Sequence, residues 1–272
     1  MSINVCIAGT TGWTGSVVAR HLLESDEFEV VGALARQQAG NDLGDVLGVA
    51  PAGLTILSTL DEVLAAGVRP DVLVDYTKPD SVKARTMSAL EHGIRVVVGT
   101  SGLTAADYTE IEALAISRGL GVIAAGNFSI TATLAKHFSL IAARYVPTWE
   151  IIDYAYAGKV DAPSGTVQEL AEALGEIAES KVAVPIDQTY GSKQARGATI
   201  GGAQVHSVRL PGIVIGFETL FGLPDERLSI RHDAGSGAEP YAMGTLLAVK
   251  KVMEITGLIR GLDTLLFGEA TA

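Results

Sequence analysis

A short string in the second half of the chain combines a lysine with the start of a helix. Lys159 is followed, after Pro163, by Ser164-Gly165-Thr166. Proline is typical of the first turn of a helix, and the Ser164 and Thr166 hydroxyls can cap free amides there. Free helix amides and a nearby ammonium group together favour an anion, most naturally a carboxylate. An ordinary capped helix start with a surface lysine explains the same residues equally well.

A glycine-rich turn near the N-terminus points to a nucleotide. It reads Gly9-Thr10-Thr11-Gly12-Trp13-Thr14-Gly15 and follows an apolar segment at residues 3–8. Glycines at such a turn let the backbone approach a pyrophosphate, and the helix that follows supplies amide donors. The spacing G-x-x-G-x-x-G is a weak signal alone, because many turns carry glycine for steric reasons. Its place at the first strand-to-helix crossover predicts a dinucleotide site.

The second apolar segment, residues 28–34, is followed by Arg36 where an NAD-binding fold usually has a carboxylate. That carboxylate accepts hydrogen bonds from the adenosine ribose, whereas an arginine suits a 2′-phosphate. A solvated surface arginine is also common at such a position. We expect NADPH as the cofactor, with NADH possible.

Small and polar residues follow two further apolar segments. In open α/β sheets, ligands bind outside the carboxyl ends of the strands, and small residues leave room there for a nicotinamide ring. Together with residues 9–15 and Arg36, we assign to the cofactor site Gly99, Thr100, Ser101, Ala125, Asn127 and Phe128.

The elements that must position these residues differ between the two halves of the chain. Continuous apolar segments separated by helical patterns predict a doubly wound parallel sheet of the Rossmann-like α/β class over residues 1–127. Residues 128–239 predict a second, α+β domain with a mixed sheet, in which the alternation at 203–209 indicates a half-exposed antiparallel strand. A helix at about 240–272 is expected to pack back on the first domain.

The composition excludes several functional classes. The chain has 272 residues, of which 48% are hydrophobic, and a net charge of -11. Such an acidic protein lacks the positive surface of a nucleic-acid or membrane binder. A single cysteine, Cys6, and the absence of a signal-peptide pattern predict a soluble cytoplasmic protein that acts on a small molecule. No spacing of His, Cys or carboxylates predicts a metal site.

The string from Lys159 to Thr166 resembles the signature of the 4-hydroxy-tetrahydrodipicolinate reductase (dihydrodipicolinate reductase) family. The resemblance extends to residues 9–15, 76–79, 99–102, 126–129 and 199–201 and to the C-terminal helix. It implies a Rossmann domain and a substrate-binding domain that also assembles a homotetramer. The implied reaction is hydride transfer from NAD(P)H to a cyclic unsaturated dicarboxylate in lysine (diaminopimelate) biosynthesis.

The resemblance also implies roles for individual residues. The lysine matching Lys159 takes part in catalysis in the family, and the pair matching Gly165-Thr166 binds a substrate carboxylate; we place Ser164 in the same substrate site. The family has two adjacent histidines before that lysine, the first its proton donor, where this chain has Ala155 and Tyr156. We therefore expect Tyr156 to hydrogen-bond the substrate and Lys159 to supply the proton, if burial lowers its pKa.

Two alternatives follow from the missing histidines. A paralogous reductase could act on a different cyclic imine or imino acid, because an imine nitrogen can be protonated without that acid. A catalytically silent nucleotide-binding protein could have kept the fold. The intact string from Lys159 to Thr166 favours an enzyme.

Overall fold

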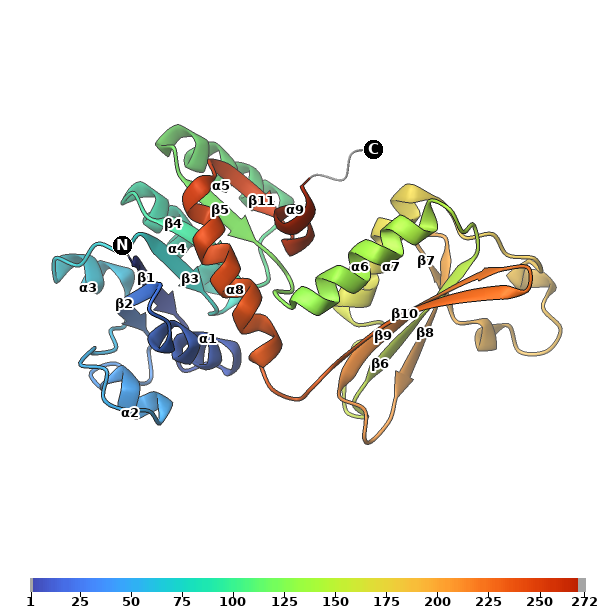
Figure 1. Cartoon of the computed structure of the whole chain (residues 1–272), viewed down its shortest axis with the longest axis horizontal. Helices are drawn as coiled ribbons and strands as arrows, with labels where there is room; N and C mark the ends of the chain where they lie inside the picture. The colour runs from blue at the N-terminus through green and yellow to red at the C-terminus, as the bar shows by residue number, and fades with distance from the viewer. Residues whose placement is uncertain (1, 269–272) are drawn as a thin grey trace. The chain divides into compact units, whose positions relative to one another are not determined.

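The computed structural model describes residues 2–268 and divides into two compact units. The first unit runs to Ile130 and resumes at Ala238, and the second comprises Thr131–Gly237. Figure 1 shows the strands and helices of each unit.

The first unit is built on a six-stranded sheet in which every pairing is parallel, in the order β11-β5-β4-β3-β1-β2. Its strands are β1 (Ile3–Ala8), β2 (Phe28–Leu34), β3 (Val72–Asp75), β4 (Arg95–Val98), β5 (Gly121–Ala124) and β11 (Gly257–Arg260). The strands are almost continuously apolar because both faces of the sheet are covered. The Rossmann-like fold class expected from the sequence is confirmed.

Helices pack on both faces of this sheet. They are α1 (Trp13–Glu24), α2 (Leu43–Leu47), α3 (Leu60–Ala65), α4 (Pro79–Glu91), α5 (Ala105–Arg118), α8 (Glu239–Lys251) and α9 (Leu262–Phe267), with a 3₁₀ turn at Val252–Glu254. On β1, Val5 and Ile7 pack toward α1 and α8, which lie side by side in Figure 1. Cys6 and Ala8 point to the other face, toward α3, α4 and α5.

The C-terminal segment corrects one expectation. A helix at about 240–272 was expected, but α8 ends at Lys251 and the chain then adds β11 to the sheet, parallel to β5. The strand is only four residues long, Gly257–Arg260, and periodicity cannot separate so short an apolar run from a helix. Residues 269–272 lie outside the described residues.

The second unit has a five-stranded mixed sheet in the order β10-β9-β6-β8-β7. Its elements are α6 (Ile130–Ala143), β6 (Trp149–Ala155), α7 (Gly165–Ile177), β7 (Ala198–Ile200), β8 (Ala203–Arg209), β9 (Ile215–Leu223) and β10 (Glu226–Ala234), with 3₁₀ turns at Ile186–Gln188 and Lys193–Arg196. Both helices contribute to one apolar cluster on a single face of the sheet. Side chains along β6 alternate between buried and half-buried, as expected for a sheet covered on one face.

The direction of β8 corrects a second expectation. The alternation at residues 203–209 was interpreted as an antiparallel strand, but β8 runs parallel to β6 and antiparallel only to β7. Alternation reports which side chains face the core and carries no information on the direction of the neighbouring strand. The helix α7 lies between β6 and β8 in the chain, and such a crossover returns the next strand parallel to the first.

Residues 2–268 contain neither a membrane-spanning helix nor a cluster of metal-binding side chains. None of the helices found there has both the length and the apolar composition needed to span a bilayer. Within the same residues, no three His, Cys, Asp or Glu side chains gather closely enough to hold a metal ion.

Candidate active site

The glycine turn lies where the strand order of the first sheet reverses. β1 pairs with β2 on one side and with β3 on the other, so the loops after β1 and β3 meet at the same edge. Gly9 has φ +86°, and a Cβ there would overlap the carbonyl oxygen of Tyr76 after β3. A Cβ on Gly15 would overlap the carbonyl oxygen of Gly9. These two glycines allow the close approach of loop, helix and strand that a pyrophosphate site needs.

The N-terminus of α1 offers free amide groups at this edge. Its N-cap residue, Gly12, has no side chain to accept a hydrogen bond, and the first turn contains no acidic residue. The backbone amide of Gly12 donates to the carbonyl of Gly9 at 2.9 Å, which closes the turn. The uncapped helix end therefore presents donors and a partial positive charge to an anion.

One cavity, of about 330 Å³, opens beside the turn, and we call it the Arg36 cavity. It is lined by Gly9, Thr11, Gly12, Leu34, Ala35, Arg36, Gln37, Ser58, Tyr76, Thr77, Lys78, Ser81 and Arg85. Three of these residues are cationic and none is a carboxylate. Among the described residues, no carboxylate forms an ion pair with Arg36 or Lys78, so both charges are available to an anionic ligand.

The third cation, Arg85, forms an ion pair with a buried carboxylate. Asp75, at the end of β3, is fully buried and accepts a hydrogen bond from Arg85 Nη1 at 2.6 Å. Its Oδ1 also accepts from the backbone amide of Thr77 at 2.9 Å and from the Thr100 hydroxyl at 2.8 Å. One carboxylate thus ties the loop after β3 to the loop after β4.

A second cavity, of about 300 Å³, lies on the other side of the turn, and we call it the Trp13 cavity. It is lined by Gly12, Trp13, Thr14, Tyr76, Thr77, Pro79, Gly99, Thr100 and Ser101. It shares Gly12, Tyr76 and Thr77 with the Arg36 cavity, so the two adjoin across the helix N-terminus. The Trp13 ring meets Tyr241 of α8 edge-on, with ring centroids 5.7 Å apart.

The two cavities bring together most of the residues assigned to the cofactor from the sequence. Five assigned residues line neither cavity. Thr10 is buried with its hydroxyl on the Leu34 carbonyl, Gly15, Ala125 and Phe128 are buried, and the Asn127 side chain accepts from the Ser129 amide. Sequence reasoning missed Arg85, because it lies inside α4 rather than at a strand end. It also assigned no role to Tyr76-Thr77-Lys78, although a short apolar segment directly before them was the available signal.

In the second unit, Lys159 lies in the loop that follows β6. Its side chain is 19% exposed, and Nζ forms an ion pair with Asp161 Oδ1 at 2.8 Å. The hydrogen bond from Lys159 holds the pKa of the Asp161 carboxyl below its usual value. Tyr156 is 52% exposed, and its carbonyl accepts from the Lys159 amide at 3.1 Å. Ala155, the last residue of β6, is fully buried.

The helix α7 begins directly after this loop and also lacks a side-chain cap. Ser164 is the N-cap residue, and Pro163 precedes it rather than opening the helix. The sequence suggested that Ser164 or Thr166 caps the helix, but no side chain caps it, and the Ser164 hydroxyl donates to Asp153 instead, at 2.8 Å. Within residues 2–268, no acceptor is found for the backbone amides of Gly165 and Thr166. These amides are therefore open to an external anion.

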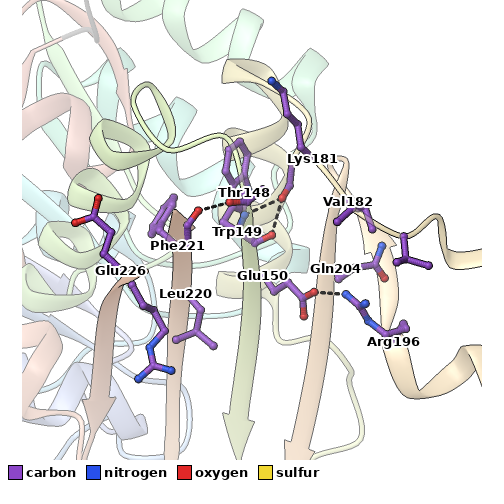
Figure 2. Close-up of a pocket in the computed structure, with 15 residues that line it drawn as sticks. Thr148, Trp149, Glu150, Lys181, Val182, Arg196, Gln204, Leu220, Phe221 and Glu226 are labelled. Carbon is purple, nitrogen blue, oxygen red and sulfur yellow. Dashed lines mark hydrogen bonds and ion pairs between the residues drawn. The ribbon is translucent and has the colours of Figure 1, made fainter. Parts of the chain in front are cut away.

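A third cavity, of about 550 Å³, lies in the second unit at the amino end of β6, and we call it the Trp149 cavity. Figure 2 shows its lining, with Glu150 paired to Arg196. The indole nitrogen of Trp149 and the side-chain oxygen of Gln204 are buried there, and neither has a partner among the described residues. None of the residues assigned from the sequence lines this cavity.

Comparisons with known proteins cover nearly the whole chain. The family model "Dihydrodipicolinate reductase, N-terminus" matches residues 3–128, and "Dihydrodipicolinate reductase, C-terminus" matches residues 128–266. The 4-hydroxy-tetrahydrodipicolinate reductase of Moorella thermoacetica is 40% identical over 97% of this chain and 98% of its own. The enzyme of the same name from Bacillus pumilus is also 40% identical, with the same coverage. A solved structure, dipicolinate-bound dihydrodipicolinate reductase from Paenisporosarcina sp. TG-14, has a TM-score of 0.87 at 32% identity and covers 97% of this chain and 100% of its own.

Proposed function

The chain belongs to the dihydrodipicolinate reductase family, and we propose that it is an NADPH-dependent reductase of the cyclic dicarboxylate for which its relatives are named, 4-hydroxy-tetrahydrodipicolinate, in lysine biosynthesis. The observation that carries this proposal is the uncapped start of α7, where free amides follow the loop that holds Lys159. The substrate is a dianion, and a helix N-terminus next to a lysine is suited to a carboxylate.

The first unit fits a nicotinamide dinucleotide, which supplies the hydride when bound. The Gly9–Gly15 turn and the free amides of α1 suit the pyrophosphate. Arg36 and Lys78 line a cavity without a carboxylate, so they suit a 2′-phosphate and favour NADPH. The small residues Gly99, Thr100 and Ser101 in the Trp13 cavity leave room for the nicotinamide end.

The second unit supplies the groups that hold the substrate. The Gly165 and Thr166 amides bind one carboxylate, and the Lys159 ammonium neutralises further negative charge. Lys159 also holds, at Nζ, the proton that the reduced product requires, because Ala155 cannot donate one. Tyr156, whose side chain is half exposed, donates a hydrogen bond to the substrate.

The decisive experiment measures the oxidation of NADPH by the full-length protein with freshly generated 4-hydroxy-tetrahydrodipicolinate. We expect turnover by the wild type and a loss of about 10²–10⁴-fold in kcat/KM for Lys159→Ala, the usual scale for removal of an acid-base group. The matched control is Lys193→Ala, which removes an exposed lysine of the same unit outside the loop and should leave turnover unchanged. Full activity of Lys159→Ala would remove the catalytic assignment.

One observation favours a second candidate substrate. Ala155 stands where the family has its proton-donating histidine, and it is fully buried. A cyclic imine or imino acid carries a nitrogen that can be protonated in solution, so its reduction does not need that histidine. Near-zero turnover of 4-hydroxy-tetrahydrodipicolinate, with NADPH oxidation on another cyclic imine, would select this alternative. NADPH binding without oxidation on any of these substrates would indicate a silent protein.

We also propose that the protein assembles as a homotetramer through the mixed sheet. The face of this sheet opposite α6 and α7 carries Ile152, Tyr154 and Leu220, all partly exposed in the single chain. Covering these apolar residues with a second copy of the chain removes them from water, which stabilises the assembly.

A further inference from the structure

A buried carboxylate in the second unit lies directly under the loop that carries Lys159. Asp153 belongs to β6 and is fully buried. Its Oδ1 accepts a hydrogen bond from the Ser164 hydroxyl at 2.8 Å. Its Oδ2 accepts from the Ser164 backbone amide at 2.9 Å and from Arg209 Nη2 at 2.7 Å, with the Ser207 hydroxyl at 3.3 Å. These donors fix the orientation of the buried Asp153 side chain.

The contact with Ser164 changes what the start of α7 can bind. A serine at the N-cap position normally turns its hydroxyl oxygen toward the amides of the first helical turn and satisfies one of them. Here the same hydroxyl points to Asp153, and no side chain caps α7. The amides that a capping serine would occupy are left without a partner in the described part of the chain.

Arg209 connects Asp153 to a second point of the loop, at Asp161. While one bond from Nη2 reaches Asp153, a second bond from the same nitrogen reaches the carbonyl oxygen of Asp161 at 2.7 Å. The ion pair therefore fixes the loop at Asp161, two residues after Lys159, and again at Ser164. Both groups proposed to hold the substrate, the Lys159 ammonium and the α7 amides, adjoin these two fixed points.

We propose that Asp153 is a positioning residue for substrate binding: it draws the Ser164 hydroxyl away from the α7 amides and, through Arg209, fixes the loop from Lys159 to Thr166, so that the helix start stays open to a carboxylate. This inference rests on the proposed function of that loop. Asp153 itself does not touch the substrate. Its effect is to keep the anion site empty and in place before the substrate arrives.

The experiment measures the affinity of the full-length protein for dipicolinate, a stable dicarboxylate, by calorimetry. We expect Asp153→Asn to weaken dipicolinate binding and to raise the substrate KM by about tenfold or more, with a smaller change in kcat. The Kd for NADPH should not change, because its proposed site lies in the other unit, and an unchanged far-ultraviolet circular dichroism spectrum shows that the second unit of the variant is folded.

Ser207→Ala is the matched control. It removes a hydrogen bond to the same Asp153 oxygen without touching the loop, so dipicolinate affinity should stay within about twofold of the wild type. Arg209→Lys keeps the positive charge, but its shorter side chain should not reach both Asp153 and Asp161, so it should weaken dipicolinate binding with an unchanged Kd for NADPH. Asp153→Asn and Arg209→Lys variants that both bind dipicolinate as the wild type does would overturn the proposal.

A double variant tests the role given to the Ser164 hydroxyl. In Asp153→Ala the Ser164 hydroxyl loses its acceptor and is free to cap α7, so the additional change Ser164→Ala should recover part of the lost dipicolinate affinity. A double variant that binds no better than Asp153→Ala would overturn that role. The proposed reaction is tested separately, with the wild type. Wild-type protein that binds dipicolinate but does not reduce the substrate contradicts the proposed reaction. Wild-type protein that binds no dipicolinate contradicts both the proposed reaction and the role of Asp153.

Discussion

Ser164 and Arg36 show how far a residue type can be interpreted before its neighbours are known. A serine before a helix predicts a capping hydroxyl, but in the structure that hydroxyl belongs to the Asp153 network. Arg36 was assigned from its place after a strand, and the structure puts it in a cavity with Lys78 and Arg85. Local position indicated where Arg36 lies, at the end of a strand beside the glycine turn, and its role in cofactor binding stays a prediction. Local position failed at Ser164, because a carboxylate on another element, Asp153 of β6, accepts the hydroxyl.

At the residue scale, Arg36 should determine the preference for NADPH. We expect Arg36→Ala to raise the KM for NADPH by about tenfold or more and to leave the KM for NADH nearly unchanged, because a charge-assisted bond to a phosphate is lost only with NADPH. Steady-state kinetics with both nucleotides measures this. Arg118→Ala, at the end of α5 and outside both cavities, should change neither value. Equal losses with the two nucleotides would contradict the assignment.

At the element scale, the starts of the helices fall into two kinds. α2, α3 and α5 are capped by the side chains of Asp42, Thr59 and Thr104, which stabilises the helix and closes its N-terminus. α1 and α7, which begin at the proposed nucleotide and substrate sites, have no side-chain cap, and the same holds for α4, α8 and α9. An open helix start costs stability, and it is the form that an anion site requires.

The capping box of α5 predicts a pH dependence. Hydrogen bonds, first from Lys83 and then from Thr104, lower the pKa of Asp107 from its ordinary 3.8 to about 2. A carboxyl whose pKa is lower in the folded state stabilises the fold above its unfolded pKa, and this contribution is lost as the pH falls toward 2. The melting temperature of Asp107→Asn should therefore lie below that of the wild type above about pH 4, and the gap should close toward pH 2. The control Glu112→Gln, on an exposed side of α5, should show no such gap.

At the scale of the whole molecule, positive groups lie at the proposed binding sites although the net charge of the chain is negative. The net charge of -11 opposes an anionic cofactor and a dianionic substrate. Local groups offset this field: the amides of α1 and α7, the Arg36 cavity and Lys159. Salt screens the interaction of a bound anion with distant surface carboxylates more strongly than its interaction with donors in direct contact. A few fixed donors at the site therefore attract the anion more strongly than the dispersed negative charge repels it.

Assembly is the prediction that belongs to the whole molecule. We expect Ile152→Glu, on the open face of the mixed sheet, to convert a tetramer into smaller species at micromolar concentration, because burying an unpaired charge at an interface is costly. Sedimentation velocity measures the change. Leu228→Glu makes the same substitution on β10, opposite Phe221 and on the helix-covered side, and should leave the tetramer intact. A wild type that sediments as a monomer would contradict the assembly.

The sequence by itself determined the class of the first unit and the place of the glycine turn, and it predicted a role in substrate binding for the Lys159–Thr166 string. These features are local: a buried strand is apolar along its length, and a glycine turn is set by the backbone within a few residues. Only the tertiary structure brought Asp75, Arg85, Asp153 and Arg209 into place, and only it decided the direction of β8 and the addition of β11. Apart from the Asp75–Arg85 pair, whose members are separated by 10 residues, each of these depends on contact between segments far apart in the chain. No local pattern encodes such a partner, because the energy that selects it arises from burial and charge pairing in the folded protein.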